Sequence, residues 1–336
     1  MHMAAPVRIL IYAAVRDEKM LEQGFYLAEA DGLRAHPRVA EVRLTNRLGE
    51  VLRGQYDALV SYFYSHSAAA ATFARLRGRP VVVTGGAEQL FPELAASWRQ
   101  HNIRLTAFRL TAATATRLLA TSTSDLHQMR RLAPWATEKI ELSFHGAAAV
   151  ERPATDGVES RPAASFVTIC GLDTALNIER KGIPETLALL NASVRDNPDA
   201  YLTIIGRTTC RDLVEQHATA LGVTGRVRFA GYVSEVDKIA LLRAHRYYVQ
   251  LSTYEGFGIG ALEALAQGCQ VIHSGAGGLG DTIAHFGVVL PPADAGKFLL
   301  AGLPRYAGPA DPALAEHLSR FQPSRRADTI VRAMSA

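Results

Sequence analysis

Short apolar runs alternate with amphipathic stretches along the whole chain. In the first half, six such runs predict strands at residues 7–11, 39–44, 58–61, 81–84, 118–121 and 140–144, with helical stretches between several of them. In the second half, five more runs are strand-like and each leads into a helix or a turn: SFVTICG, YLTIIG, VRFAGYV, YYVQLS and CQVIHS. This alternation is typical of parallel sheets with helical crossovers, so it predicts an α/β fold.

The two halves are separated by residues 151–165, ERPATDGVESRPAAS, which contain Pro, Gly, Ser and charge but no periodicity. We interpret this segment as an interdomain linker. At 336 residues and 48% hydrophobic content, the chain is too long for one ordinary core and suits two domains of roughly 150 residues each. We therefore expect doubly wound domains at 1–150 and 166–310. The tail from residue 311 is amphipathic around Pro323, which predicts a bent terminal helix.

Composition narrows the class of protein. Cys170, Cys210 and Cys269 have neither metal-binding spacing nor even pairing, which favours reduced thiols in a cytoplasmic setting and no metal site. The net charge of +4 is mild and the arginines are spread, so nucleic-acid binding is disfavoured. A basic face would still suit phosphates or the inner face of an anionic membrane. The first apolar run, at 7–15, is too short to span a bilayer.

The most informative motif is YEGFGIGALEALAQG at residues 254–268. It follows a strand-like run, so the predicted order is strand, glycine-rich turn and helix. The N-terminal amides of a helix lack partners and carry partial positive charge, and Gly256, Gly258 and Gly260 would let phosphates approach the backbone. Glu255 falls in that turn. Glu263 is the only charge among apolar residues of the helix, where a carboxylate needs partners such as sugar hydroxyls.

Each part of this motif has an ordinary alternative, because a single glutamate on a helix is more often a solvated residue. The later sequence GAGGLG also fits the dinucleotide fingerprint G-x-G-x-x-G, the mark of a dehydrogenase. We disfavour that interpretation because the match is isolated and lies late in a domain that already has a phosphate turn.

Together with the following AQGCQVIHSGAGGLGDTI, the motif resembles the donor-binding signature of the family 4 retaining glycosyltransferases. In that family two glutamates frame seven residues, and a second glycine-rich loop follows. Asp281 stands where the family usually has glutamate, and Gly280 where proline is frequent. The resemblance implies a GT-B fold: two Rossmann-like domains face each other across a cleft, the first binding the acceptor and the second the donor. It also implies a C-terminal helix that crosses back to the first domain; an ordinary capping helix is the alternative.

The resemblance assigns roles to residues of the second half. The family pattern of a glycine, an arginine and then a lysine–glycine pair is matched by Gly171, Lys181 and Gly182, while Leu172 replaces the arginine, so Arg180 takes that role. Glu255 would contact the donor sugar and Glu263 the ribose hydroxyls. The remaining donor contacts would be amides of the glycine turn and loops that hold the base: Gly256, Phe257, Gly258 and Ile259, then Gly206, Arg207, Tyr232 and Val233.

The first half departs further from the family. Its first strand should lead into a glycine-rich loop near the diphosphate, and only Gly24, followed by Phe25, is available. The family histidine near the reaction centre is absent from residues 84–88. We predict His66 as its substitute, with Glu88 as an alternative polar group and a packing or surface role as the alternative for His66.

By resemblance, the predicted reaction is transfer of a sugar from a UDP- or GDP-sugar to an acceptor hydroxyl with retention of configuration, without a metal or other cofactor. The acceptor stays open among glycan, lipid and natural product, and the charge leaves peripheral membrane contact open. Two alternatives remain: a catalytically impaired sugar-nucleotide-binding partner subunit, motivated by Leu172 and the missing histidine, and a nucleotide-sugar epimerase.

Overall fold

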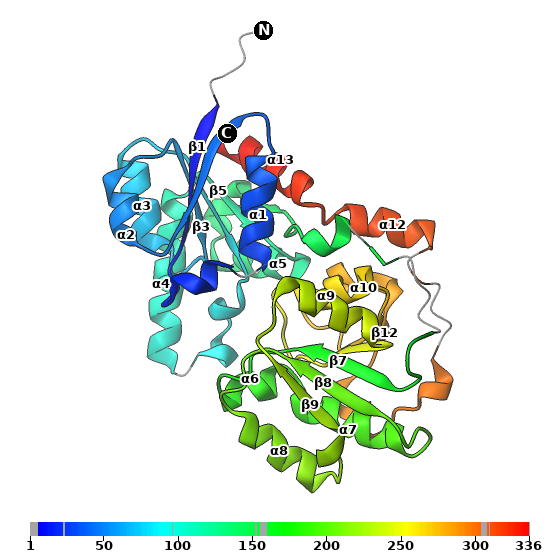
Figure 1. Cartoon of the computed structure of the whole chain (residues 1–336). Helices are drawn as coiled ribbons and strands as arrows, with labels where there is room; N and C mark the ends of the chain where they lie inside the picture. Colours follow the sequence, from blue (N-terminus) through cyan, green and yellow to red (C-terminus); the bar gives the residue numbers. More distant parts are fainter. Residues whose placement is uncertain are drawn as a thin grey trace. The chain divides into compact units, whose positions relative to one another are not determined.

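The chain is described by a computed structural model that covers residues 6–335 except 23, 96, 152, 155–159, 304–307 and 309. It divides into two compact units (Figure 1). The first unit comprises Met1–Ala148 and Arg320–Ala336, and the second comprises Ala149–Ser319. Each unit is built around its own parallel sheet, which confirms the prediction of an α/β fold with two doubly wound parts.

The first unit has a six-stranded sheet in the order β2-β1-β3-β4-β5-β6. The strands are β1 (Val7–Ala13), β2 (Val39–Thr45), β3 (Ala58–Tyr62), β4 (Val81–Gly85), β5 (Arg117–Ala120) and β6 (Ile140–Leu142). The helices before the second unit are η1 (Glu18–Glu22), α1 (Gly24–Arg34), α2 (Leu48–Arg53), α3 (Ala68–Leu76), η2 (Glu88–Leu90), η3 (Pro92–Leu94), α4 (Trp98–Thr114), α5 (Thr123–Leu132) and η4 (Pro134–Lys139). All six predicted strands are confirmed to within two residues at each end.

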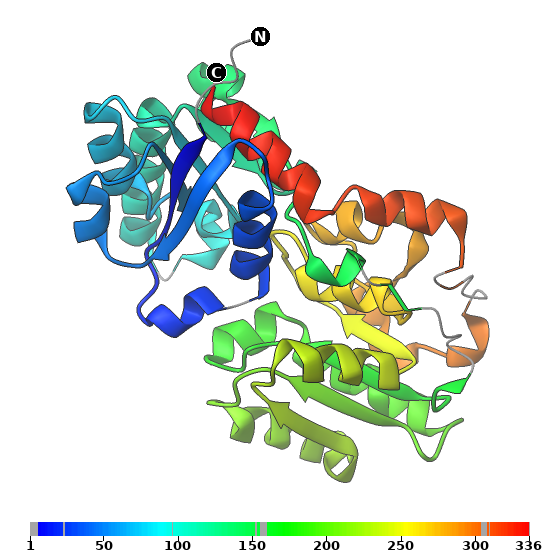
Figure 2. The same ribbon diagram turned by 45° about the horizontal axis from the view of Figure 1, so that its top comes forward.

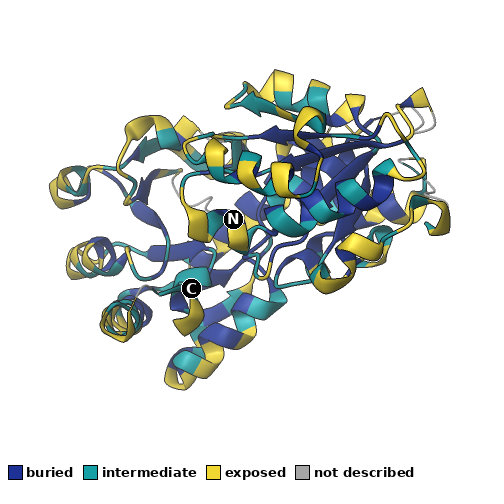
Figure 3. Ribbon diagram, turned by 90° about the horizontal axis from the view of Figure 1, so that it is seen from below, coloured by how far each residue is buried: buried dark blue, intermediate teal, exposed yellow. Residues whose placement is uncertain are grey.

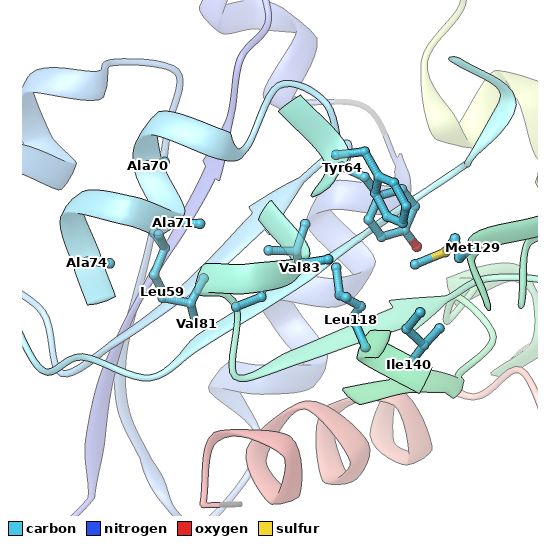
Figure 4. Close-up of a cluster of buried hydrophobic side chains, with 14 of the residues drawn as sticks. Leu59, Tyr64, Ala70, Ala71, Ala74, Val81, Val83, Leu118, Met129 and Ile140 are labelled. Carbon is cyan, nitrogen blue, oxygen red and sulfur yellow. The ribbon is translucent and has the colours of Figure 1, made fainter. Parts of the chain in front are cut away.

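Both faces of this sheet are covered, as parallel sheets require. Alternate strand residues point to opposite faces, so Leu59, Val81 and Leu118 join one core cluster with α3 and α5 (Figure 4). Val60 and Val82 join the other cluster, which also takes residues from α1 and from the C-terminal helix. Burial is accordingly concentrated in the strands, and exposed residues lie on the outer sides of the helices (Figure 3). This double burial explains why the central strands β3 and β4 are mostly apolar, whereas the edge strand β2 contains Glu41 and Arg43.

The second unit has the strand order β12-β11-β10-β7-β8-β9. Its strands are β7 (Ser165–Ile169), β8 (Tyr201–Ile205), β9 (Val227–Gly231), β10 (Tyr247–Gln250), β11 (Gln270–His273) and β12 (Val288–Val289). Its helices are η5 (Ala148–Glu151), α6 (Ala175–Arg180), α7 (Ile183–Val194), α8 (Arg211–Ala220), η7 (Thr224–Arg226), α9 (Glu235–Ala244), α10 (Ile259–Ala266), α11 (Leu279–Thr282), η8 (Ala284–Phe286), η9 (Pro292–Lys297) and η10 (Leu300–Gly302). The strand order reverses between β7 and β10, and ligands of such sheets bind where the order reverses, beyond the carboxyl ends of the strands.

The C-terminal tail forms two helices, where the sequence predicted one bent helix. Helix α12 (Pro312–Ser319) belongs to the second unit, where the Nε2 atom of His317 lies 2.8 Å from the carbonyl oxygen of Thr282. Helix α13 (Pro323–Met334) belongs to the first unit and packs against α1 (Figures 1 and 2). Pro323 occupies the first turn of α13, a position that tolerates proline because no intrahelical donor is needed there. The proline therefore starts a helix instead of bending one.

A buried ion pair fastens α13 to the first unit. Arg326 is 2% exposed; its Nε atom donates to Glu29 at 2.8 Å, and it also donates to the carbonyl of Ser143 at 2.8 Å and to the hydroxyl of Thr84 at 2.5 Å. The hydroxyl of Tyr62 donates to the other oxygen of Glu29 at 2.6 Å. Burial alone would raise the pKa of Glu29, but Arg326 and neighbouring donors hold it at about 2.

The described part of residues 151–165 is bound to the second unit. Arg161, only 8% exposed, donates to the carbonyls of His245 at 2.8 Å and Gln267 at 2.7 Å, and the amide of Ala154 donates to Ala266 at 2.9 Å. The rest of the predicted linker, residues 152 and 155–159, lies outside the described residues.

Candidate functional site

The glycine-rich motif forms the predicted strand, turn and helix. Strand β10 ends at Gln250, residues 251–258 form the turn, and α10 begins at Ile259. Gly258, at the start of the helix, has a φ of +90°, which other residues rarely adopt. The turn therefore presents the amides of Phe257, Gly258 and Ile259 at the N-terminus of α10, where helix amides lack intrahelical partners.

The second glycine-rich loop packs directly on this turn. The amide of Gly278 donates to the carbonyl of Glu255 at 2.7 Å. A Cβ atom on Gly277, whose φ is +58°, would lie 2.1 Å from the same carbonyl oxygen, and one on Gly278 would lie 2.6 Å from the carbonyl oxygen of Gly256. Side chains on this loop would push the two backbones apart, so its glycines fix the shape of the turn before α10 and need not touch a dinucleotide.

Glu255 is paired with Lys181. The distance between Lys181 Nζ and Glu255 Oε2 is 2.5 Å, and the side chains are 17% and 14% exposed. The same carboxylate oxygen accepts a hydrogen bond of 2.5 Å from Gln250, whose own amide oxygen accepts one of 2.9 Å from the hydroxyl of Tyr248. Lysine has three donors, so this pair leaves Lys181 with further donors for an anion. Gln250 was not predicted, although a glutamine inside the run YYVQLS was a visible signal.

In the lysine–glycine pair Lys181–Gly182, the glycine is required because the backbone at Gly182 lies very close to the backbone at Leu251. Gly182 has a φ of +66°, and a Cβ atom there would lie 2.1 Å from the carbonyl oxygen of Leu251. The amide of Thr253 donates to the carbonyl of Arg180 at 2.9 Å. The junction between α6 and α7 is thus pressed against the loop after β10, and this contact places Lys181 beside Glu255.

Arg180 is held by neutral groups. It donates to the carbonyl of Tyr254 at 3.1 Å and to the side-chain oxygen of Asn177 at 2.7 Å, and Asn177 donates in turn to the carbonyl of Gly171. Among the described residues no carboxylate pairs with Arg180, so its positive charge stays available. Leu172, in contrast, is fully buried in the core of the second unit, which explains why the family arginine cannot stand there.

The loops after β8 and β9 lie at the same edge of the sheet. A Cβ atom on Gly206, whose φ is +139°, would lie 2.2 Å from the carbonyl oxygen of Cys170, so glycine is required for this contact. Arg207 forms a bidentate pair with Asp173 at 2.8 and 2.9 Å, and these hydrogen bonds lower the pKa of Asp173. Tyr232 is 66% exposed and Val233 is half-buried, immediately before α9.

Glu263 has a partner that the sequence did not reveal. It is 7% exposed, and its Oε1 atom lies 2.9 Å from the Nζ atom of Lys238 on α9. Lys238 also lies 2.7 Å from Glu235, which is largely solvated. Burial raises the pKa of Glu263, and the charge of Lys238 opposes that rise. One oxygen of Glu263 is thus committed to Lys238, and the other is available as an acceptor.

The structure brings together Gly171, Arg180, Lys181 and Glu255 at the reversal between β7 and β10, with Gly206 beside them. Gly24, His66 and Glu88 belong to the first unit. Gly24 is the first residue of α1, His66 is exposed in the turn after β3, and Glu88 begins η2. Their roles in the reaction remain predictions. Among the described residues, no three His, Cys, Asp or Glu side chains are grouped as metal ligands, and no helix is apolar and long enough to cross a membrane.

Two six-stranded parallel sheets with helices on their faces, the second with a glycine-rich turn at its reversal point, define a class: α/β proteins with the GT-B architecture of glycosyltransferases. The crystal structure of Anabaena Alr3699/HepE in complex with UDP and glucose has this fold, with a TM-score of 0.73 and 17% identity over 98% of this chain and 99% of that chain. At this identity the likeness concerns the fold.

Residues 176–300 match the family described as Glycosyl transferases group 1. The chain is 35% identical to the glycogen synthase of Mycobacterium tuberculosis over 105 residues, which are 31% of this chain and 25% of the relative. It is 30% identical to the GDP-mannose:cellobiosyl-diphosphopolyprenol alpha-mannosyltransferase of Xanthomonas oryzae pv. oryzae over 220 residues, 62% of this chain and 52% of the relative. Residues 176–300 are thus similar to the group 1 glycosyl transferases, which confirms the resemblance for this part of the chain. The chain spans between a quarter and about half of these relatives.

Proposed function

We propose that the chain transfers a sugar from a nucleoside-diphosphate sugar to an acceptor hydroxyl with retention of anomeric configuration. The second unit binds the donor and the first binds the acceptor. The observation that carries the proposal is the pair of Lys181 and Glu255 at 2.5 Å, beside the amide-rich start of α10 and the unneutralised Arg180.

In this mechanism the bond between the anomeric carbon and the diphosphate oxygen breaks, and the acceptor hydroxyl forms the new bond on the same face of the sugar. The acceptor proton passes to the departing diphosphate, so no covalent nucleophile is needed. Negative charge grows on the diphosphate as it leaves. Lys181, Arg180 and the amides of residues 257–259 stabilise that charge because they are already oriented before the reaction.

The two carboxylates have separate roles. Glu255, oriented by Lys181 and Gln250, accepts hydrogen bonds from hydroxyls of the donor sugar. Glu263 accepts bonds from the ribose with the oxygen that Lys238 leaves free. The loops at Gly206 and at Tyr232 and Val233 hold the base through backbone and apolar contacts. No metal or other cofactor takes part in this proposal.

The base of the donor is uridine or guanosine. HepE was crystallised with UDP, and the mannosyltransferase relative is named for GDP-mannose. The acceptor is a glycan, a lipid or a natural product. No specific observation favours the partner-subunit or epimerase alternative.

The first test is thermal stabilisation of the purified chain by UDP, GDP, ADP and their sugars without added metal. Ligand at about one hundred times its dissociation constant stabilises the folded state by about 2.7 kcal/mol, a readily measured shift. A response to one base is expected. If no nucleotide raises the melting temperature, the proposal fails.

The second test is Lys181→Ala, which should lower turnover of the stabilising donor, followed as release of the nucleoside diphosphate, by about a hundredfold or more. Lys297→Ala, in an exposed segment of the same unit, is the control. Turnover of Lys181→Ala equal to that of the control would exclude the proposed role of Lys181.

A further inference from the structure

Helix α4 of the first unit exposes large apolar side chains. Trp98 is 80% exposed, Ile103 60% and Leu110 47%. A residue of this size is normally buried or covered, and single exceptions need no explanation. Three such side chains on one helix of 17 residues need one.

These residues share one side of α4. At 3.6 residues per turn, Trp98, Ile103 and Leu110 fall within an arc of about 140°. Arg99 and Arg109 fall within the same arc and are also exposed. The opposite side is the one that packs on the unit, with Phe108, Thr111 and Ala112 buried. Helix α4 therefore has apolar residues on its buried side and both apolar and cationic residues on its exposed side.

Neighbouring elements continue this surface. Helix α3 packs against α4 and exposes Phe73 by 38% and Leu76 by 78%, with Arg75 between them. The short helix η4 also contacts α4 and exposes Trp135 by 57%. We call the exposed sides of α3, α4 and η4 the α3–α4 face; α3 and α4 are labelled in Figure 1.

The charge of this region is one-sided. Residues 58–139, which include α3, α4 and η4, contain nine arginines, one lysine, three glutamates and one aspartate, a net charge of +6, whereas the whole chain has +4. Helix α4 itself contains no acidic residue. Among the described residues, Arg75 and Arg99 have no ion-pair partner. The positive charge of the α3–α4 face is thus largely uncompensated within the protein.

We propose that the α3–α4 face lies on a membrane surface that contains anionic lipids. Tryptophan prefers the interface between headgroups and acyl chains, and arginines set between apolar residues meet lipid phosphates while the apolar side chains enter the bilayer. Tryptophan and arginine are also enriched at protein–protein interfaces, so the choice of occupant rests on charge: α4 has no acidic residue, and an anionic lipid surface complements its arginines. This inference is independent of donor binding by the second unit.

The test is flotation of the full chain with vesicles of phosphatidylcholine alone and of phosphatidylcholine with about 30% phosphatidylglycerol, whose negative surface potential attracts basic residues. We expect binding to the anionic vesicles, weakened by salt. Removal of both Arg75 and Arg99, each to Gln, should weaken it by about fivefold per arginine. Trp98→Ser combined with Ile103→Ser should weaken it by about tenfold or more.

Matched controls come from the second unit. Leu299→Ser removes an apolar side chain that is 59% exposed, close to the 60% of Ile103, and Arg195→Gln removes an exposed arginine. Neither should change flotation. Trp135→Phe leaves Trp98 as the one tryptophan of the chain, so its fluorescence should shift to the blue on anionic vesicles.

Two results would overturn the proposal. One is the absence of flotation with anionic vesicles, or flotation that the Trp98 and Ile103 changes leave intact. The other is a concentration-dependent dimer, measured by sedimentation without vesicles, that these changes convert to monomer; the face would then bind a second copy of the chain.

Discussion

The pairing of Lys238 with Glu263 makes a sharp prediction about stability. Both side chains are nearly covered, at 12% and 9% exposure, and their charged atoms are 2.9 Å apart. Replacing Lys238 by Met leaves Glu263 as a buried carboxylate without a cation. Breaking a buried pair in this way costs about 3–5 kcal/mol at neutral pH.

The cost must depend on pH in a definite direction. Without Lys238 the pKa of Glu263 in the folded state rises further above that of the unfolded chain, so the folded state binds a proton more readily. Stability is then retained at low pH and lost as pH increases, at up to about 1.4 kcal/mol per pH unit. Lys238→Met should therefore be close to the wild type at pH 5 and clearly weaker at pH 7.5.

The assay is thermal unfolding of the second unit's transition at both pH values, with Lys297→Met as the exposed control. Adding Glu263→Gln to Lys238→Met should restore most of the loss, because the uncompensated charge is gone. A loss of stability in Lys238→Met that is equal at pH 5 and 7.5, or that Glu263→Gln does not relieve, would refute the reasoning.

Two further predictions concern the junction before α7 and the C-terminal helix. Gly182→Ala should destabilise the second unit by about 1–3 kcal/mol and weaken nucleotide binding, because Gly182 has a positive φ and contacts Leu251. The control is Gly222→Ala: Gly222 has a φ of +71° and nothing within 4 Å of an added Cβ atom, so this variant measures the loss of stability caused by the positive φ without a clash. Binding in Gly182→Ala as strong as in the control would contradict the contact argument. Arg326→Met should destabilise the first unit by about 3–5 kcal/mol, with the exposed Arg325→Met as control. The pKa of Glu29 is lowered to about 2 in the folded wild type, so its contribution to stability is complete above the unfolded-state pKa near 4.5 and is lost as pH falls toward 2. Acid unfolding monitored by circular dichroism should lack this pH dependence in Arg326→Met.

The fold was predictable because its central strands, such as β3 and β4, are buried on both faces and are therefore mostly apolar runs. The strand that escaped prediction, β12, has two residues and too little sequence to show a pattern. The single bent helix predicted for the tail was wrong because a proline within an amphipathic sequence is compatible with a bend in one helix and with the first turn of a second helix.

The glycine-rich turn before α10 was predictable because glycines and glutamates at fixed spacing leave a visible motif. Its supporting residues were not. Lys238 lies on α9, 25 residues from Glu263, and the sequence of this helix mixes charged and apolar residues without a distinct pattern. Asn177 joins Gly171 to Arg180 through contacts that only the folded loop creates. A pairing between distant helices leaves no local trace in the sequence.

The ion pair between Arg326 and Glu29 joins residues 297 positions apart, with the whole second unit between them in the chain. A ribosome therefore finishes the second unit before it makes the last helix of the first. During synthesis the second unit is able to fold as soon as it emerges, whereas the early strands wait for Arg326, the partner of Glu29, with one face of their sheet covered by α1 but not yet by α13. This face of the first sheet therefore stays accessible longest to chaperones that bind apolar surface. Truncation of the C-terminal tail is expected to impair folding of the first unit and to leave folding of the second unit intact.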